Sequence, residues 1–142
     1  MKQKVMLAIQ GRQAYQEQEP EIIQLTTEGW MEFRDGGWDI FYEESDLTGM
    51  GGVTTTFRVE PDKVTLTRTG KLQSQMVFQR GVQHDSLYRM EFGALMISVC
   101  ATHLFFDITP EGGVIDLVYR IEIEKSAAGI VDYHLDIRAI NE

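Results

Sequence analysis

The sequence predicts an all-β protein, a single antiparallel up-and-down β-barrel of about ten strands. Apolar residues recur at every second position in segment after segment, as in residues 114–123, whereas no segment shows a convincing period of 3.6 residues. Turn signals return every ~10–12 residues. Because the connections are short, neighbours in sequence should pair as antiparallel hairpins. A meander of this length closes most naturally into a barrel, which removes exposed edges.

The N-terminal part gives the clearest strands. The first spans residues 2–14 and the second spans residues 21–34, where Gly29 is expected to mark a bulge or a barrel bend. A strong hairpin turn signal, Asp35-Gly36-Gly37, then leads into the third strand. From there the predicted strands are 38–44, 53–60, 63–69, 72–80, a strand that follows Gly81 and runs to Met90, 94–102, 104–109, 114–124 and 130–140. The pattern does not define the joint near Thr102.

Length and composition fit one domain, residues 1–142. At 43% hydrophobic residues, the chain can form a full core without disulfides. It has one cysteine, Cys100, so no intramolecular disulfide is possible. That composition suits a reducing compartment, and we expect a cytoplasmic location. The apolar run from Val5 to Ile9 is too short for a signal peptide, and no run reaches the roughly 20 residues of a membrane span.

The charge argues against nucleic-acid binding. The chain has 22 acidic and 13 basic residues, a net charge of −9, and its basic residues are scattered singly. A duplex-binding surface needs clustered lysine and arginine to displace counterions. The negative charge is interpreted as a contribution to solubility.

Loop and turn residues carry a family resemblance over nearly the whole chain. The motifs that carry it are Tyr42-Glu43-Glu44, Leu47 through Gly52, Thr54-Thr55-Thr56, Leu66-Thr67-Arg68, Gly70, Met76-Val77-Phe78, Gly81, Tyr88, Phe92-Gly93 to Val99, Gly112 through Ile115 and Tyr119. Together they resemble the YwiB-like family of uncharacterised bacterial proteins. The resemblance implies a calycin-like β-barrel, related in shape to lipocalins and fatty-acid-binding proteins, and it implies no activity. One departure is Glu91, where a proline is expected before Phe92.

Arg68 is the most informative candidate for a binding residue. It alternates with the apolar residues Val64 and Leu66 on one face of its strand. If that face is the interior, the cation needs a protein carboxylate or an anionic ligand head group as its partner. Glu43 is the internal partner that we consider. The alternative is that Arg68 lies near a strand end and extends its guanidinium group to solvent.

Five further side chains are candidates for the barrel interior or its mouth. Tyr42, Tyr88 and Tyr119 could supply hydroxyl groups, although buried tyrosines commonly fill space and find one partner. Thr55 shares a face with apolar residues, so its hydroxyl could orient a ligand. Met50 lies in a glycine-rich loop and would be an adaptable apolar contact. That loop has neither the lysine nor the helix of a phosphate-binding loop.

No catalytic or metal-binding motif of any specificity is present. His134 lies between Asp132 and Asp136, and alternation places the three on one face, which is geometrically compatible with a metal ion. Because the opposite face of that strand is apolar, we expect the trio to face water and hold no metal, with the two acids favouring a protonated imidazole. Neither His84 nor His103 forms a close pair with another histidine, and Cys100 is interpreted as a structural thiol.

Two functions of different kinds fit these observations. The first is a binding module for a small apolar or amphipathic ligand, because about ten strands leave more interior than eight, which side chains can fill. This hypothesis rests partly on analogy of fold. The alternative is a closed-barrel structural or interaction protein, a homodimer or a protein that docks on a partner, favoured by strands with apolar residues on both faces. An enzyme using Glu43, Arg68 and a tyrosine ranks third, and no cofactor is expected.

Overall fold

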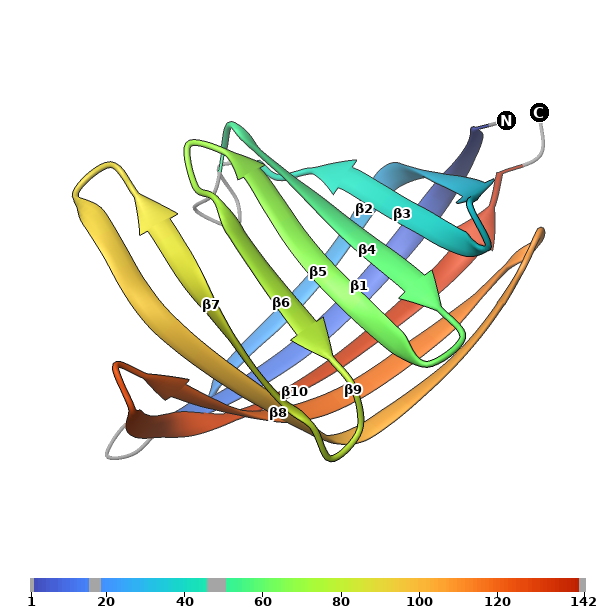
Figure 1. Ribbon diagram of the computed structural model, residues 1–142. Helices are drawn as coiled ribbons and strands as arrows, with labels where there is room; N and C mark the ends of the chain where they lie inside the picture. Colours follow the sequence, from blue (N-terminus) through green and yellow to red (C-terminus); the bar gives the residue numbers. More distant parts are fainter. Residues whose placement is uncertain (1, 16–18, 46–50, 141–142) are drawn as a thin grey trace.

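The computed structural model describes residues 2–15, 19–45 and 51–140, and these residues form ten β-strands and no helix (Figure 1). The strands are β1 (Gln3–Tyr15), β2 (Glu21–Arg34), β3 (Gly37–Glu43), β4 (Val53–Glu60), β5 (Lys63–Gly70), β6 (Ser74–Phe78), β7 (Gln83–Met90), β8 (Gly93–Thr109), β9 (Gly112–Ile123) and β10 (Ser126–Ala139). Within this part of the chain, no helix therefore has the length and apolar character needed to cross a membrane.

The strands form one antiparallel sheet that closes almost completely into a barrel. Its order is β6-β5-β4-β3-β2-β1-β10-β9-β8-β7, so β1 joins the first and last halves of the chain by pairing with both β2 and β10. Between β6 and β7 the ladder is reduced to isolated bridges, one of which joins Gln73 and Arg89 through backbone bonds of 3.0 and 2.7 Å. The predicted up-and-down barrel is thus confirmed, with a seam between β6 and β7.

Two predicted boundaries are corrected by the ladder. Residues 94–102 and 104–109 belong to one strand, β8, whose register against β9 shifts between Ala101 and His103. A β-bulge of this kind interrupts the two-residue alternation without ending the strand, which explains the unclear joint in the sequence. The expected loop before residue 130 is also shorter. Glu124 and Lys125 both have positive φ (52° and 68°), and β10 begins directly after them at Ser126.

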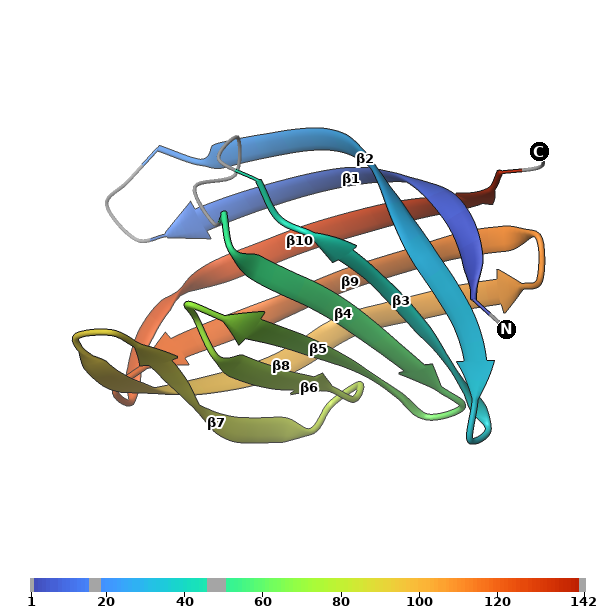
Figure 2. The same ribbon diagram turned by 90° about the horizontal axis from the view of Figure 1, so that it is seen from above.

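The core follows the alternation of the strands. In β4, Val53, Thr55, Phe57 and Val59 are buried, while the residues between them are half-buried. The buried apolar cluster draws on β1 through β6 and β8 through β10, and each fully buried aliphatic side chain in it stabilises the fold by about 1.5–3 kcal/mol. Strand β2 is bent (Figure 2), and a Cβ atom at Gly29 in this strand would come within 2.6 Å of the Phe41 carbonyl oxygen. The close approach of β2 and β3 therefore requires glycine.

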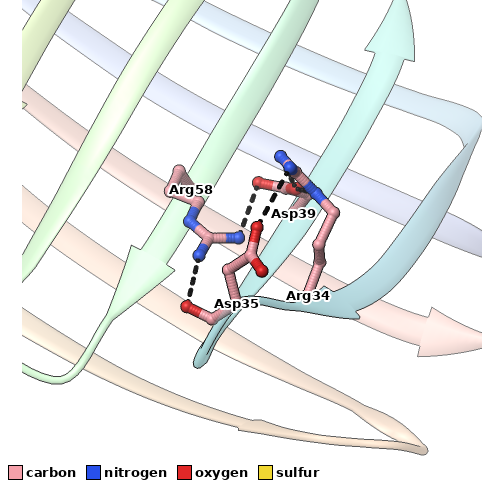
Figure 3. Close-up of polar contacts among 4 residues, drawn as sticks. All are labelled: Arg34, Asp35, Asp39 and Arg58. Atoms are coloured by element: carbon pink, nitrogen blue, oxygen red, sulfur yellow. Dashed lines mark hydrogen bonds and ion pairs between the residues drawn. The ribbon is translucent and has the colours of Figure 1, made fainter.

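An ion cluster on the outer face fixes the β2–β3 hairpin (Figure 3). Asp39 is buried, and its Oδ2 accepts hydrogen bonds from Nε and Nη2 of Arg34 at 3.0 and 2.8 Å. Its Oδ1 lies 3.3 Å from Nη1 of Arg58, and Arg58 also donates to the backbone oxygen of Asp35 at 3.0 Å. Since both arginines are engaged with Asp39, this cluster is a structural element of the turn.

Candidate functional site

A row of polar side chains crosses the interior wall of the barrel. Tyr42 on β3 lies opposite Thr55 on β4, Thr55 lies opposite Arg68 on β5, and Arg68 lies opposite Ser74 on β6. Residues directly opposite one another on neighbouring strands share a face of the sheet. Thr55 is fully buried and Tyr42 and Ser74 almost so, which shows that this face is the interior. We call these four residues the polar row.

Glu44 adds a carboxyl group to the polar row. Thr55 donates a hydrogen bond from Oγ1 to Oε2 of Glu44 at 2.6 Å, and both residues are buried. The backbone N–H of Glu44 donates to the Val53 oxygen at 2.8 Å, so the β3–β4 ladder continues past the end of β3. Alternation along that extension places Glu44 on the same side as Tyr42.

This geometry corrects the assignment of Glu43. Glu43 is exposed on the outer face of β3, opposite Thr54, and it is not the carboxylate near Arg68. The carboxylate near Arg68 is that of Glu44. Alternation places Glu44 on the same face as the buried Ile40 and Tyr42, whereas Glu43 shares a face with Phe41. The alternation of this strand already contained the signal needed to choose between the two residues.

Two tyrosine hydroxyls complete the polar end. Burial raises the pKa of Tyr42 well above its ordinary value, and the nearby Tyr133 and Glu44 raise it further. Burial also raises the pKa of Tyr133, against the effect of the neighbouring Tyr42 and Arg68 groups. Both phenols therefore stay protonated at neutral pH and keep a proton to donate. The Tyr133 ring packs 5.7 Å from that of Phe57, centre to centre.

Two atoms of the polar row are buried without a hydrogen bond. Nε of Arg68 and Oγ of Ser74 have no hydrogen-bond partner among the described residues, and the two residues lie opposite each other. Buried polar atoms nearly always find a partner, because leaving one unsatisfied costs about 1–3 kcal/mol. A buried arginine N–H and a neighbouring buried hydroxyl that both lack hydrogen-bond partners are typical of sites that receive a ligand or an ordered water.

A small cavity of about 80 Å³ adjoins this polar end. Its walls carry Tyr42, Glu44, Arg68 and Tyr133 together with the mainly apolar side chains of the facing wall, Ile9, Gly11, Gln13, Ile23, Leu25 and Val131. A cavity of this size holds on the order of five water molecules. This volume is small for a barrel of ten strands, a number that can leave room for a ligand.

The remaining candidates from the sequence lie elsewhere. Tyr119 is buried in the core, with its ring 4.5 Å from that of Phe78. Tyr88 is half-buried on β7 and packs against the core cluster. Met50 falls outside the described residues. The structure thus brings Tyr42, Thr55 and Arg68 together and adds Glu44, Ser74 and Tyr133, which sequence reasoning did not assign to the site.

His134 lies on the outer face and is held by two carboxylates. Its Nδ1 pairs with Asp116 on β9, and its Nε2 lies 3.1 Å from Oδ2 of Asp136. The hydrogen bond to Asp116 is the main cause that raises the pKa of His134, with Asp136 adding to it. The two carboxylates that hold His134 are therefore those of Asp136 and Asp116, and not those of Asp136 and Asp132. No group of three or more metal-ligating side chains is found within the described ranges.

A mainly apolar hollow lies on the outside of the barrel. It has a volume of about 450 Å³ and crosses the outer face of β8, β9 and β10. We call it the outer groove; its lining is Ala14, Gln83, Ser98, Val99, Cys100, Arg120, Ile121, Glu122, Ala127, Gly129 and Ile130. Several of these side chains are small, which explains why the surface is hollowed there. The buried atoms that lack partners do not line it, so the interior cavity is the stronger candidate for a small-molecule site.

The fold and the interior site define a class of protein, the antiparallel up-and-down β-barrels, here with ten strands and a polar end to the interior. Residues 7–137 match the family model described as "Domain of unknown function (DUF1934)", and the chain belongs to this family. The chain is also similar to the crystal structure of the ywiB protein from Bacillus subtilis, with a TM-score of 0.85 and 20% identity over 99% of this chain and 94% of that one. The predicted YwiB-like relationship is confirmed. No curated protein is significantly similar to this chain.

Proposed function

We propose that this protein binds a small amphipathic ligand, with an anionic head group held by Arg68 at the polar end of the barrel interior. The observation that carries the proposal is the pair of buried atoms without partners, Nε of Arg68 and Oγ of Ser74, on neighbouring strands. Of these two residues, Arg68 lines the interior cavity, where a ligand carboxylate supplies an acceptor for its guanidinium group. The negative charge of the carboxylate also compensates the desolvation of the guanidinium group.

The cavity wall supports a head group of this kind. Arginine presents its donors in a planar fork that matches the two oxygens of a carboxylate. The hydroxyl groups of Tyr42 and Tyr133 stay protonated and hydrogen-bond to each other, and Tyr42 also hydrogen-bonds to Glu44, so this part of the wall is polar. Opposite them, Ile23, Leu25 and other apolar side chains give the carbon chain of the ligand a surface to cover.

The size of the cavity limits the ligand. Pockets for drug-sized molecules have volumes of about 300–1,000 Å³, whereas this cavity has about 80 Å³. It therefore accommodates a carboxylate with a few carbon atoms. A longer chain would extend toward the end of the barrel where β5 is connected to β6.

Titration calorimetry with straight-chain carboxylates of increasing length, from acetate upward, tests the proposal, with the alcohols of equal length as uncharged controls. We expect saturable binding of the acids that strengthens with chain length until the cavity is filled, and weaker binding of the alcohols. Arg68→Met should weaken the binding of acids by tenfold or more, in keeping with the loss of a charged hydrogen bond. Arg68→Met also leaves the buried Glu44 carboxylate without its neighbouring cation, which destabilises a fold, so circular dichroism must show that the variant is folded before its binding is measured.

Arg12→Met is the matched control, because Arg12 is exposed on the outer face of β1 and its replacement removes the same charge. It should leave the binding of acids unchanged. Absence of binding for every acid in the series, or equal binding by wild type and Arg68→Met, would refute the proposal.

A further inference from the structure

The β7–β8 hairpin carries large apolar side chains into solvent. Leu87 is 43% exposed, Met90 39%, Met96 36%, and Phe92 at the turn 95%. The bridge between Gln73 and Arg89 joins β7 to the chain just before β6, and beyond it Figure 1 shows the turn between β7 and β8 projecting at the end of the barrel. Apolar side chains grouped in this way on a protruding element are typical of a surface that another protein covers.

The outer groove lies on the same face as Leu87, Met96 and Phe92, whereas Met90 shares the other face of β7 with the inward-facing Tyr88. Along β8, residues 92, 94, 96, 98 and 100 have the same parity. Leu87 lies opposite Met96, and Gln83 lies opposite Cys100 of the groove. Because side chains alternate along a strand, Met96 points to the same outer face as Cys100, and Phe92 at the turn extends that series. The groove therefore forms one continuous surface with Leu87, Met96 and Phe92.

The spacing along this surface is symmetric. Cys100 in the groove is four residues from Met96, and Met96 is four residues from Phe92, which corresponds to about 13 Å in each direction at ~3.3 Å per residue. Met96 and Leu87 are thus midway between the groove and the hairpin turn. A twofold axis through that midpoint brings the turn of one copy over the groove of the other, and the reverse contact follows from symmetry.

We propose that a second copy of this chain docks on this surface, with Phe92 of each copy seated in the outer groove of the other. Leu87 and Met96 lie at the axis and contact their own equivalents. This interface uses the outer face of the barrel, so it is independent of the ligand proposed for the interior.

Charge and size favour a second copy as the occupant. Glu91 precedes Phe92 in the turn, and the groove lining carries the cation Arg120 beside Glu122, so docking of the turn pairs each Glu91 with Arg120 of the partner subunit and gives two opposite-charge pairs. A contact that spans eight residues of β8 and four strands covers about 26 Å by about 19 Å. Because β9 borders β8 only from Ile97 on, this rectangle of about 490 Å² is an upper limit; it is smaller than the ~800 Å² per partner of a standard interface and fits a dimer that forms at high protein concentration.

Sedimentation velocity over a wide concentration range tests the proposal. Wild type should form a dimer, and Phe92→Ser should raise the dissociation constant by about tenfold or more, as for an aromatic anchor in a pocket. Phe105→Ser is the matched control, because Phe105 is also an exposed aromatic (51%) on β8 but lies on the far side of the bulge from the groove. Its dissociation constant should equal that of wild type.

A charge exchange and a cross-link test the register. Glu91→Arg and Arg120→Glu should each weaken the dimer, and the double variant should regain much of the lost affinity. In Glu91→Cys, the added thiol is about 26 Å from Cys100 of its own chain, too far for an internal disulfide. Oxidation with diamide should therefore give a covalent dimer through the partner's Cys100, and Cys100→Ser should prevent it.

A wild-type protein that stays monomeric at all concentrations would overturn the proposal. So would a dimer that Phe92→Ser leaves unchanged, a dimer that Phe105→Ser weakens equally, or a dimer that gives no cross-link between position 91 and Cys100.

Discussion

Thr55→Val tests whether the polar end is a hydrogen-bonded part of the interior. The substitution keeps the shape of a fully buried side chain and removes the donor that lies 2.6 Å from Oε2 of Glu44. A hydrogen bond to a charged group contributes about 1.5–3 kcal/mol, and a buried carboxylate that loses one donor also loses part of its compensation for desolvation. We therefore expect the free energy of unfolding to fall by about 2 kcal/mol. For a chain of this length that lowers Tm by about 5–8 °C.

Urea unfolding followed by the fluorescence of the two tryptophans, Trp30 and Trp38, measures this change. Thr54→Val is the matched control, because Thr54 is half-buried on the outer face of the same strand and its substitution should stay within about 0.5 kcal/mol. The slope of free energy against urea should be the same in all three proteins. If Thr55→Val is as stable as wild type, the bond between Thr55 and Glu44 contributes nothing to stability and the reasoning is wrong.

Three further predictions concern the outer face and the turns. The pKa of His134 is raised above 6.5, so the stabilisation by its protonated ring is complete below about pH 6.5 and is lost as the pH rises through the pKa of the folded state. Urea unfolding curves recorded over a series of pH values should show this loss in wild type but not in His134→Asn. Asp39→Asn should lower the free energy of unfolding by roughly 1–3 kcal/mol because it breaks a paired, buried carboxylate, whereas Asp35→Asn should have little effect on the same measurement. In calorimetry, Gly70→Ala should lower Tm more than Gly81→Ala. Both glycines have positive φ, but a Cβ atom added at Gly70 lies 2.1 Å from a backbone oxygen, whereas one added at Gly81 has no atom within 4 Å.

The interior site was only partly readable from the sequence. Alternation placed Arg68 with Val64 and Leu66, and the structure confirms that this face is the interior. The same rule places Glu44 on one face with Tyr42, so the alternation identifies Glu44, and not Glu43, as the carboxylate of the interior. Tyr133 is different, because it comes from β10 and reaches the site from the opposite wall. No local pattern relates positions 42 and 133, which meet only because the sheet closes.

By itself, the sequence determined the strands, their antiparallel order and most of their buried faces. These properties depend on local chemistry: two-residue alternation, β-branched residues and short turns such as Asp35-Gly36, where both φ angles are positive. Only the tertiary structure decided the register between strands, the seam between β6 and β7, and the bulge in β8. Register depends on contacts between residues far apart in the chain, and it sets the alignment of Tyr42, Thr55, Arg68 and Ser74 across four strands. The site exists because of that alignment, and for this reason its residues could be suspected singly from the sequence but not assembled.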